Sequence, residues 1–331
     1  MIGRIVLSSS ILLLALALSV VAALCAGAVW YSPLEAASFL LDGKSFPSEF
    51  AVLAGIRLPR IVLSVLVGGA LSASGAAFQA LLRNPLADPY IVGTSSGAAL
   101  GAAVAIVLNV SAAGIFSPIT LFAFVGSGVV MLCVYWVSLR NGRLSVESFL
   151  LSGVIAGAFC GALVSFLMVF AGKDLHHIVW WLMGGFAGRE DWDYVLLILP
   201  YFIAGVSALA FLSPSLNLFS MGEEIAASRG VDVERAKFMI IASASLLTAA
   251  AVSVAGTIGF VGFMIPHAMR RLFGSEHRIL MITSVLGGGV FLLCADTLAR
   301  CVLAGGVEIP VGIITSLCGA PFFFFVLKNK R

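Results

Sequence analysis

Long apolar stretches separated by short polar segments follow one another along almost the whole chain. Ten of them approach the roughly 20 residues that a helix needs to cross a bilayer. These spans run over about 5–30, 61–82, 91–109, 118–139, 148–171, 193–212, 238–257, 259–273, 279–299 and 310–327. The pattern predicts an all-α polytopic membrane protein in which residues 1–331 form a single transmembrane domain. Residues 238–273 are nearly continuous, so one long kinked span in that region is the alternative.

The distribution of Lys and Arg predicts an orientation. With ten spans and a cytoplasmic N-terminus, about 13 basic residues lie inside and about 6 outside, as the positive-inside rule favours. Both termini are then cytoplasmic, and residues 33–56 and 172–192 lie outside. We expect a short helix beginning at Pro33 and an interfacial or re-entrant helix over residues 177–186, which include Trp180 and Trp181.

Composition supports a chain surrounded by lipid. It is 61% hydrophobic and 11% charged, with a mean hydropathy of +1.12, whereas soluble domains carry roughly 25% charged residues. The first apolar run is too long for a signal peptide and is interpreted as an uncleaved helix. The six cysteines lack CxxC spacing and are interpreted as packing residues. His176 and His177 lack a third ligand nearby, so neither a metal site nor a cofactor is predicted.

A weak internal sequence repeat, here the internal echo, relates two parts of the chain. Small residues ending at Gly75 precede Pro85 by ten positions, and a similar run ending at Gly256 precedes Pro266 by the same spacing. Two halves of five spans each would be inverted in the membrane, as in many transporters. Chance similarity between helices rich in Ala, Ser and Gly is the alternative.

The longest and most charged cytoplasmic connection covers residues 213–237. Ser220 and Glu223 have capping-box spacing and predict a short helix that runs to Arg229 and stops at Gly230. Asp232 then caps the next helix, which leads into the membrane. The segment is either an ordinary solvated loop or a pair of short helices, at about 214–236, that receive a cytoplasmic partner.

The span 148–171 carries glycines at every fourth position: Gly153, Gly157 and Gly161. Small residues at this spacing share one helix face and allow another backbone to approach closely. The ladder indicates either ordinary helix packing or a helix that borders a pathway and shifts against its neighbours.

Three arginines lie on the predicted outer side, against the positive-inside bias. Arg57 and Arg60 flank the start of the second span, and Arg300 follows the ninth, four residues after Asp296. Interfacial anchoring with an Asp296–Arg300 pair is one interpretation. Presentation of guanidinium groups to an acidic partner is the other.

The sequence lacks the motifs by which a transporter would itself use a proton gradient or ATP. Few ionisable residues lie in the middle of a span, which argues against a proton relay. No GxxxxGK[ST] motif occurs, so the chain is not expected to hydrolyse ATP through a P-loop, and no catalytic constellation stands out. A separate subunit is therefore expected to supply the energy.

Several segments together resemble the permease subunits of type II ABC importers, which take up iron–siderophore complexes, haem and vitamin B12. The resemblance covers nearly the whole chain, and its order makes it specific. The matching segments are Arg57–Arg60, Gly75–Pro89, Gly93–Gly97, Gly222–Gly230, Ala255–His267, Asp296 with Arg300, Glu308–Gly312 and Gly319–Pro321.

This resemblance implies a homodimer in the plasma (inner) membrane of a bacterium or archaeon. Two cytoplasmic ABC ATPase subunits and a periplasmic or extracellular substrate-binding protein complete the transporter, and no nucleic acid is involved. Arg57, Arg60 and Arg300 would meet acidic residues of the binding protein. The residues that would dock on the ATPase are Gly222, Glu223, Glu224, Ala226, Arg229, Gly230 and Val231.

The resemblance also assigns a translocation path. The fifth span, with its glycine ladder, would line the path, and Asn84 and Leu86 would lie near the cytoplasmic gate. The family's loop before the fifth span is less well matched at Ser145 and Val146. An iron complex is the preferred cargo, with cobalamin and then oxyanions as alternatives. Two alternative interpretations assign the chain to a different class of protein. One is an ion-coupled secondary transporter or channel, and the other is a membrane-embedded enzyme.

Overall fold

The computed structural model describes residues 2–27, 29–42, 45–110, 117–303 and 307–328. Lys44, Lys330 and Arg331, which were counted for the orientation, lie outside the described residues. A helix covers each predicted span: α1 (Ile2–Cys25), α4 (Leu58–Leu81), α5 (Thr94–Val107), α6 (Pro118–Val137), α7 (Val146–Phe170), α9 (Trp192–Phe211), α12 (Val233–Ala255), α13 (Val261–Phe273), α14 (His277–Cys301) and α15 (Val311–Lys328).

Helix length divides these elements into two groups. Among the described residues, seven stretches are long and apolar enough to cross a membrane, and they contain α1, α4, α6, α7, α9, α12 and α14. α5 and α15 are shorter apolar helices, and the 13 residues of α13 cover only about 20 Å. The all-α membrane fold is therefore confirmed, with α5 and α13 too short to cross the layer alone.

The stretch 238–273 contains two helices rather than one kinked span. α12 ends at Ala255 and α13 begins at Val261. Gly256 has φ +71°, and a Cβ there would lie 2.3 Å from the carbonyl oxygen of Trp181. Glycine therefore permits both the turn and the close contact.

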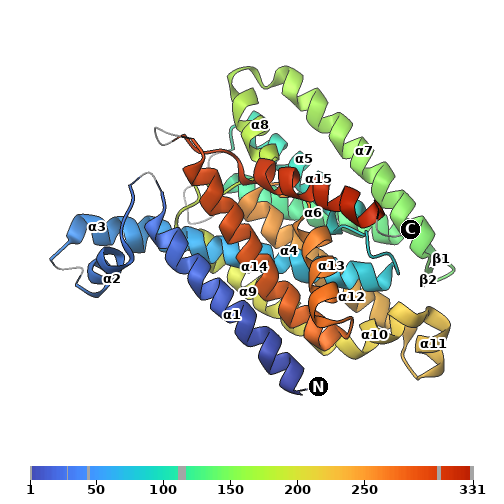
Figure 1. The fold of residues 1–331 in the computed structure, drawn as a ribbon. Coiled ribbons are helices and arrows are strands. Elements are labelled where there is room, and N and C mark those ends of the chain that lie inside the picture. The colour runs from blue at the N-terminus through green and yellow to red at the C-terminus, as the bar shows by residue number, and fades with distance from the viewer. Residues whose placement is uncertain (1, 28, 43–44, 111–116, 304–306, 329–331) are drawn as a thin grey trace.

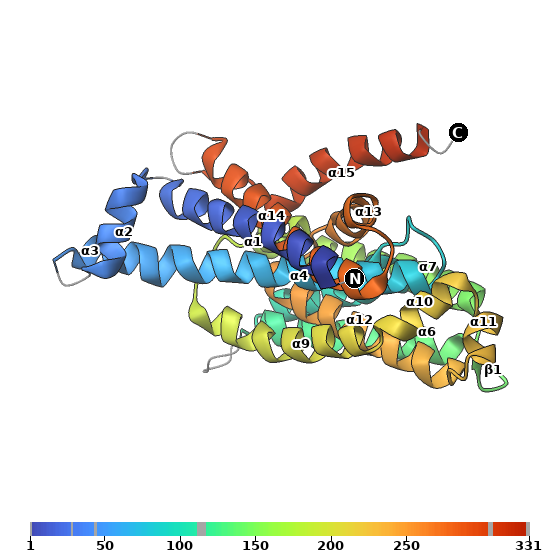
Figure 2. The same ribbon diagram turned by 60° about the horizontal axis from the view of Figure 1, so that its bottom comes forward.

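Short elements gather at the two ends of the helix bundle (Figures 1 and 2). One end, here the α3 end, carries α2 (Pro33–Leu41), α3 (Pro47–Val52) and a π-helical turn (Leu53–Arg57) that leads into α4. The opposite end, here the α11 end, carries α10 (Ser213–Met221), α11 (Glu223–Ser228) and a hairpin of β1 (Leu139–Arg140) and β2 (Arg143–Leu144). Two 3₁₀ turns cover Pro89–Val92 and Gly172–Asp174, and α8 covers Leu175–Met183.

Local sequence explains several of these elements. The helix predicted at Pro33 is confirmed, and Ser32 and Glu35 form a reciprocal capping box at its start. The hairpin was not predicted, although Asn141 and Gly142 both have positive φ and an Asn-Gly pair favours a two-residue turn. α8 confirms a short helix within residues 172–192.

α4 is the central element of the bundle, and nearly all of its residues are buried. It packs against α14, α12, α13 and α9. Two contacts bring backbones together, because a Cβ at Gly68 would lie 2.2 Å from the carbonyl oxygen of Gly288, and one at Gly75 would lie 1.7 Å from that of Gly262. α1 and α7 lie at the periphery instead (Figure 1).

The two segments of the internal echo differ in backbone structure. Gly75 lies inside α4, whereas Gly256 terminates α12. The inverted repeat stays a prediction, and the matched glycines do not occupy equivalent positions in their helices.

We predict that Gly75→Ala destabilises the protein, because the added methyl group overlaps the backbone of Gly262. Overpacking of this kind costs about 1–3 kcal/mol, and the measurement is the melting temperature of the purified protein in detergent. Gly161→Ala is the matched control, since a Cβ at Gly161 meets nothing within 4 Å. Equal melting temperatures for the two variants would contradict the proposed backbone contact.

Candidate coupling and translocation sites

A buried ion-pair cluster at the α3 end joins two helices, α4 and α14, to the connecting segments that carry Glu190 and Glu308. Arg60 of α4 is 5% exposed and Asp296 of α14 is 0% exposed. The Nη2 and Nε atoms of Arg60 lie 2.8 and 3.0 Å from the two carboxylate oxygens of Asp296. The Nη1 atom lies 2.8 Å from Glu308 and 3.2 Å from Glu190. This bidentate arrangement is the strongest form of an arginine–carboxylate pair.

The other two arginines predicted for docking also point into the protein. Arg57 donates to the carbonyl oxygens of Leu24 and Val29, and its guanidinium carbon lies 4.7 Å from the centre of the Tyr31 ring. Arg300 pairs with Asp296 at 3.3 Å and lies 3.4 Å from the carbonyl oxygens of Ala23 and Ala26. These contacts tie the end of α1 to α4 and α14.

The structure corrects the expectation that these guanidinium groups are freely presented at the surface. All three side chains are less than a tenth exposed, and the Asp296–Arg300 pair considered from the sequence is present. Glu190 and Glu308, whose side chains are 26% and 30% exposed, are the accessible members of the cluster. Contact with a binding protein stays a prediction for Arg57, Arg60 and Arg300.

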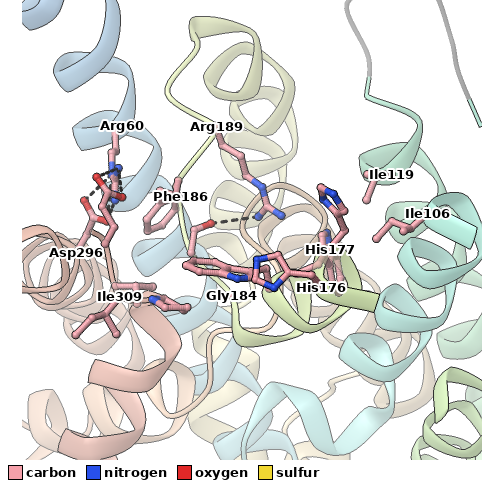
Figure 3. A pocket seen from close by; sticks show the side chains of 17 residues that line it. Arg60, Ile106, Ile119, His176, His177, Gly184, Phe186, Arg189, Asp296 and Ile309 are labelled. Atoms are coloured by element: carbon pink, nitrogen blue, oxygen red, sulfur yellow. Dashed lines mark hydrogen bonds and ion pairs between the residues drawn. The ribbon is translucent and has the colours of Figure 1, made fainter. Parts of the chain in front are cut away.

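A cavity of about 330 Å³ lies beside this cluster and is lined by α8. Figure 3 shows His176, His177 and Arg189 around it, with Arg60 and Asp296 at one side. Arg189 donates to the carbonyl oxygens of Val254 and Gly185 at 2.8 and 3.2 Å. Burial lowers the pKa of Arg189 to about 10, so the group stays positively charged at neutral pH.

Non-helical backbone between α12 and α13 is satisfied by side chains from other elements. The hydroxyl of Tyr90 donates to the carbonyl oxygen of Ile258 at 2.9 Å and accepts from its N–H at 3.1 Å. Thr257 donates to the carbonyl oxygen of Leu182. Such interruptions are tolerated in a membrane where they are buried in protein or line a cavity, and cavities of about 560 and 460 Å³ adjoin this one.

The predicted gate residues lie near these interruptions. The side chain of Asn84 accepts from the N–H of Leu86 at 2.9 Å, and Leu86 lines the cavity formed with Phe260, Phe263 and Phe323. In the glycine ladder only Gly153 makes a close contact, since a Cβ there would lie 2.2 Å from the carbonyl oxygen of Ile91. Gly157 has a single neighbour at 3.4 Å and Gly161 has none within 4 Å.

The segment predicted to dock on an ATPase forms two short helices, α10 and α11, at the α11 end. The predicted Ser220–Glu223 capping box is wrong, because α10 already contains Ser220, whose hydroxyl donates to the carbonyl oxygen of Leu216. The helix break falls at Gly222, with φ +128°, and a second break falls at Gly230, with φ +82°. The predicted cap at Asp232 is confirmed, since its side chain accepts from the N–H of Arg235.

The predicted coupling residues differ in exposure. Ala226 is fully buried, whereas Glu224 and Arg229 are exposed and Glu223 and Val231 are half-buried. Sequence reasoning missed Asn217 of α10, which accepts from the N–H and Nδ1 of His277 at 2.9 and 2.7 Å and donates to Glu276 at 3.1 Å. Asn217 thereby joins α10 to the first turn of α14. No local pattern around Asn217 marks it, because its partners are about 60 residues away.

Comparison with known proteins identifies the family. The model of the FecCD transport family matches residues 13–329. The chain belongs to this family. It is 46% identical to the cobalamin import system permease protein of Halobacterium salinarum, over 86% of this chain and 76% of that protein. It is 40% identical to the hemin transport system permease protein of Yersinia pestis, over 83% of each chain.

A solved structure supports the same assignment. An ABC transporter of the metal-chelate type in an inward-facing conformation matches with a TM-score of 0.86 and 32% identity, covering 98% of this chain and 99% of the other. The predicted resemblance is thus confirmed. This FecCD-family chain is a multi-pass permease subunit of an ABC importer.

We predict that Arg60→Met strongly destabilises the permease, because it leaves the buried Asp296 carboxylate with Arg300 alone. Breaking a buried pair from one side costs about 3–5 kcal/mol, and the melting temperature and the yield of monodisperse protein measure it. The double variant Arg60→Met/Asp296→Leu should recover part of this loss. A double variant whose loss equals the sum of both single losses would show that the two groups do not interact.

Proposed function

We propose that this permease acts as a homodimer with two ATPase subunits at the α11 end and a substrate-binding protein at the α3 end. The α11 end is then cytoplasmic, with both termini inside, and the α3 end faces outward. Family membership is the observation that supports this arrangement, and the short helices between two glycine breaks give the ATPase a separate surface to contact. ATP hydrolysis belongs to the partner subunits.

The proposed transport cycle uses two packings of similar energy. Closure of the ATPase dimer displaces α11, and this displacement rocks α7 against the second copy of the chain. Exposed apolar side chains of α7, among them Leu151, Ile155 and Phe159, supply the surface for that copy. Nucleotide and binding protein shift the equilibrium because each binds one packing better than the other.

The proposed cargo is a metal chelate. The relatives act on cobalamin, hemin and, for a permease of Bacillus subtilis that is 37% identical, Fe(3+)-citrate. An iron complex is the cargo preferred from the sequence, whereas the 46% identity to the cobalamin permease favours cobalamin. Both are bulky chelates, and both enter the test below.

We predict ATP-dependent uptake by the complete transporter in proteoliposomes. With its ATPase and binding protein, the permease should accumulate radiolabelled cobalamin or an iron–siderophore complex, whereas the permease alone should accumulate neither. The control is a catalytically inactive ATPase subunit. Accumulation by the permease alone would instead support a secondary transporter or channel.

A second prediction tests the docking role of Arg60. If an acidic residue of the binding protein contacts Arg60, it competes with Glu308, so Glu308→Gln should tighten docking several-fold. The measurement is the dissociation constant of the binding protein for the permease in nanodiscs. Glu49→Gln, which removes a half-buried carboxylate of α3, controls for general repulsion. Equal effects of both substitutions would leave Arg60 with a structural role only.

A further inference from the structure

A buried lysine joins three elements at the α11 end. Lys237 lies in the second turn of α12 and is 2% exposed. Its Nζ atom lies 2.6 Å from Glu223, 3.2 Å from Glu234 and 3.0 Å from the carbonyl oxygen of Leu144. An ammonium group has three N–H donors, so these three acceptors match its full donor capacity.

The three acceptors belong to different parts of the fold. Glu223 is the first residue of α11, Glu234 lies in the first turn of α12, and Leu144 ends β2, two residues before α7. The second oxygen of Glu234 accepts from the N–H of Leu144 at 2.8 Å, which fixes the hairpin to α12. Figures 1 and 2 show α11 and the hairpin at the same end of the bundle.

α11 is joined to the rest of the chain through a glycine at each end. α11 has six residues and lies between Gly222 and Gly230, both with positive φ. Glycine permits changes of the backbone dihedral angles at both positions, so a side-chain contact between α11 and its neighbours is the more direct route by which a displacement can be transmitted. The ion pair of Glu223 with Lys237 is such a connection.

The buried positive charge of Lys237 requires the two carboxylates around it. Burying an ammonium group is costly unless carboxylates and hydrogen bonds compensate for the lost water. The side chains of Glu223 and Glu234 are 36% and 35% exposed, so both carboxylates remain partly hydrated. Without Lys237 they would repel each other, and α11 would lose its ionic connection to α12 and to the hairpin.

We propose that Lys237 is a positioning residue that transmits the displacement of α11 to the hairpin and so to the start of α7. This inference rests on the proposed function, in which the ATPase contacts α11. The carboxylate of Glu223 moves with α11 and draws the ammonium group with it. The ammonium group in turn holds the carbonyl oxygen of Leu144, next to α7.

The test uses the complete transporter in proteoliposomes and measures the number of cargo molecules imported per ATP hydrolysed. This ratio does not depend on the amount of folded protein, which a purely structural role would change. Lys237→Met and Glu223→Gln should each lower the ratio about ten-fold, and the double variant should lower it no further. Arg235→Met, which removes an exposed positive charge two residues earlier, is the control for loss of charge.

The outcomes separate the possibilities. An unchanged ratio in both single variants, or losses that add in the double variant, would overturn the role of Lys237. Should Lys237→Met fail to fold, Glu223→Gln decides the question, because its side chain is about one-third exposed and Lys237 keeps two of its acceptors. Absence of ATP-dependent uptake by the unmodified transporter would instead overturn the proposed function.

Discussion

Contact between backbones around α4 is the constraint on which the rest of the fold depends. In lipid, helices gain little from hydrophobic burial and associate through close packing of small residues. α4 meets α14 at Gly68 and Gly288, and it meets α13 at Gly75 and Gly262. Each contact leaves no room for a methyl group. The position of α13 therefore follows from that of α4, although α13 is too short to cross the bilayer alone.

With this centre fixed, polar connections at the two ends determine which helices can move together. Asn217 joins α10 to the start of α14, and Asp296, near the other end of α14, joins Arg60 of α4. Lys237 joins α11 to the hairpin that precedes α7. α14 thus connects the two ends through the packed centre, whereas α7 lies at the periphery and packs against α5 and α6.

The sequence predicted features that depend on local chemistry. The length of each apolar stretch, the helix start at Pro33 and the cap at Asp232 follow from bilayer thickness and from neighbouring residues. Contacts between distant residues were not predictable in this way. Arg60 meets Asp296 across 236 positions, so the sequence pattern could not show that this arginine is buried in an ion pair. A capping box is a pattern of only two residues, so it also occurs where no helix begins, as at Ser220. The capping box that does form, at Ser32 and Glu35, is not among the predicted features.

The accessible members of both ion-pair clusters are carboxylates, and this has a mechanistic consequence. Arg60 and Lys237 are at most 5% exposed, whereas Glu190, Glu308, Glu223 and Glu234 are 26–36% exposed. In the proposed complexes, a partner protein would therefore meet the carboxylates of each cluster first. A ligand can shift a conformational equilibrium only by its difference in affinity for the two states. Competition for a buried cation is one source of such a difference, because the partner gains the ion pair only in the state that releases the internal carboxylate.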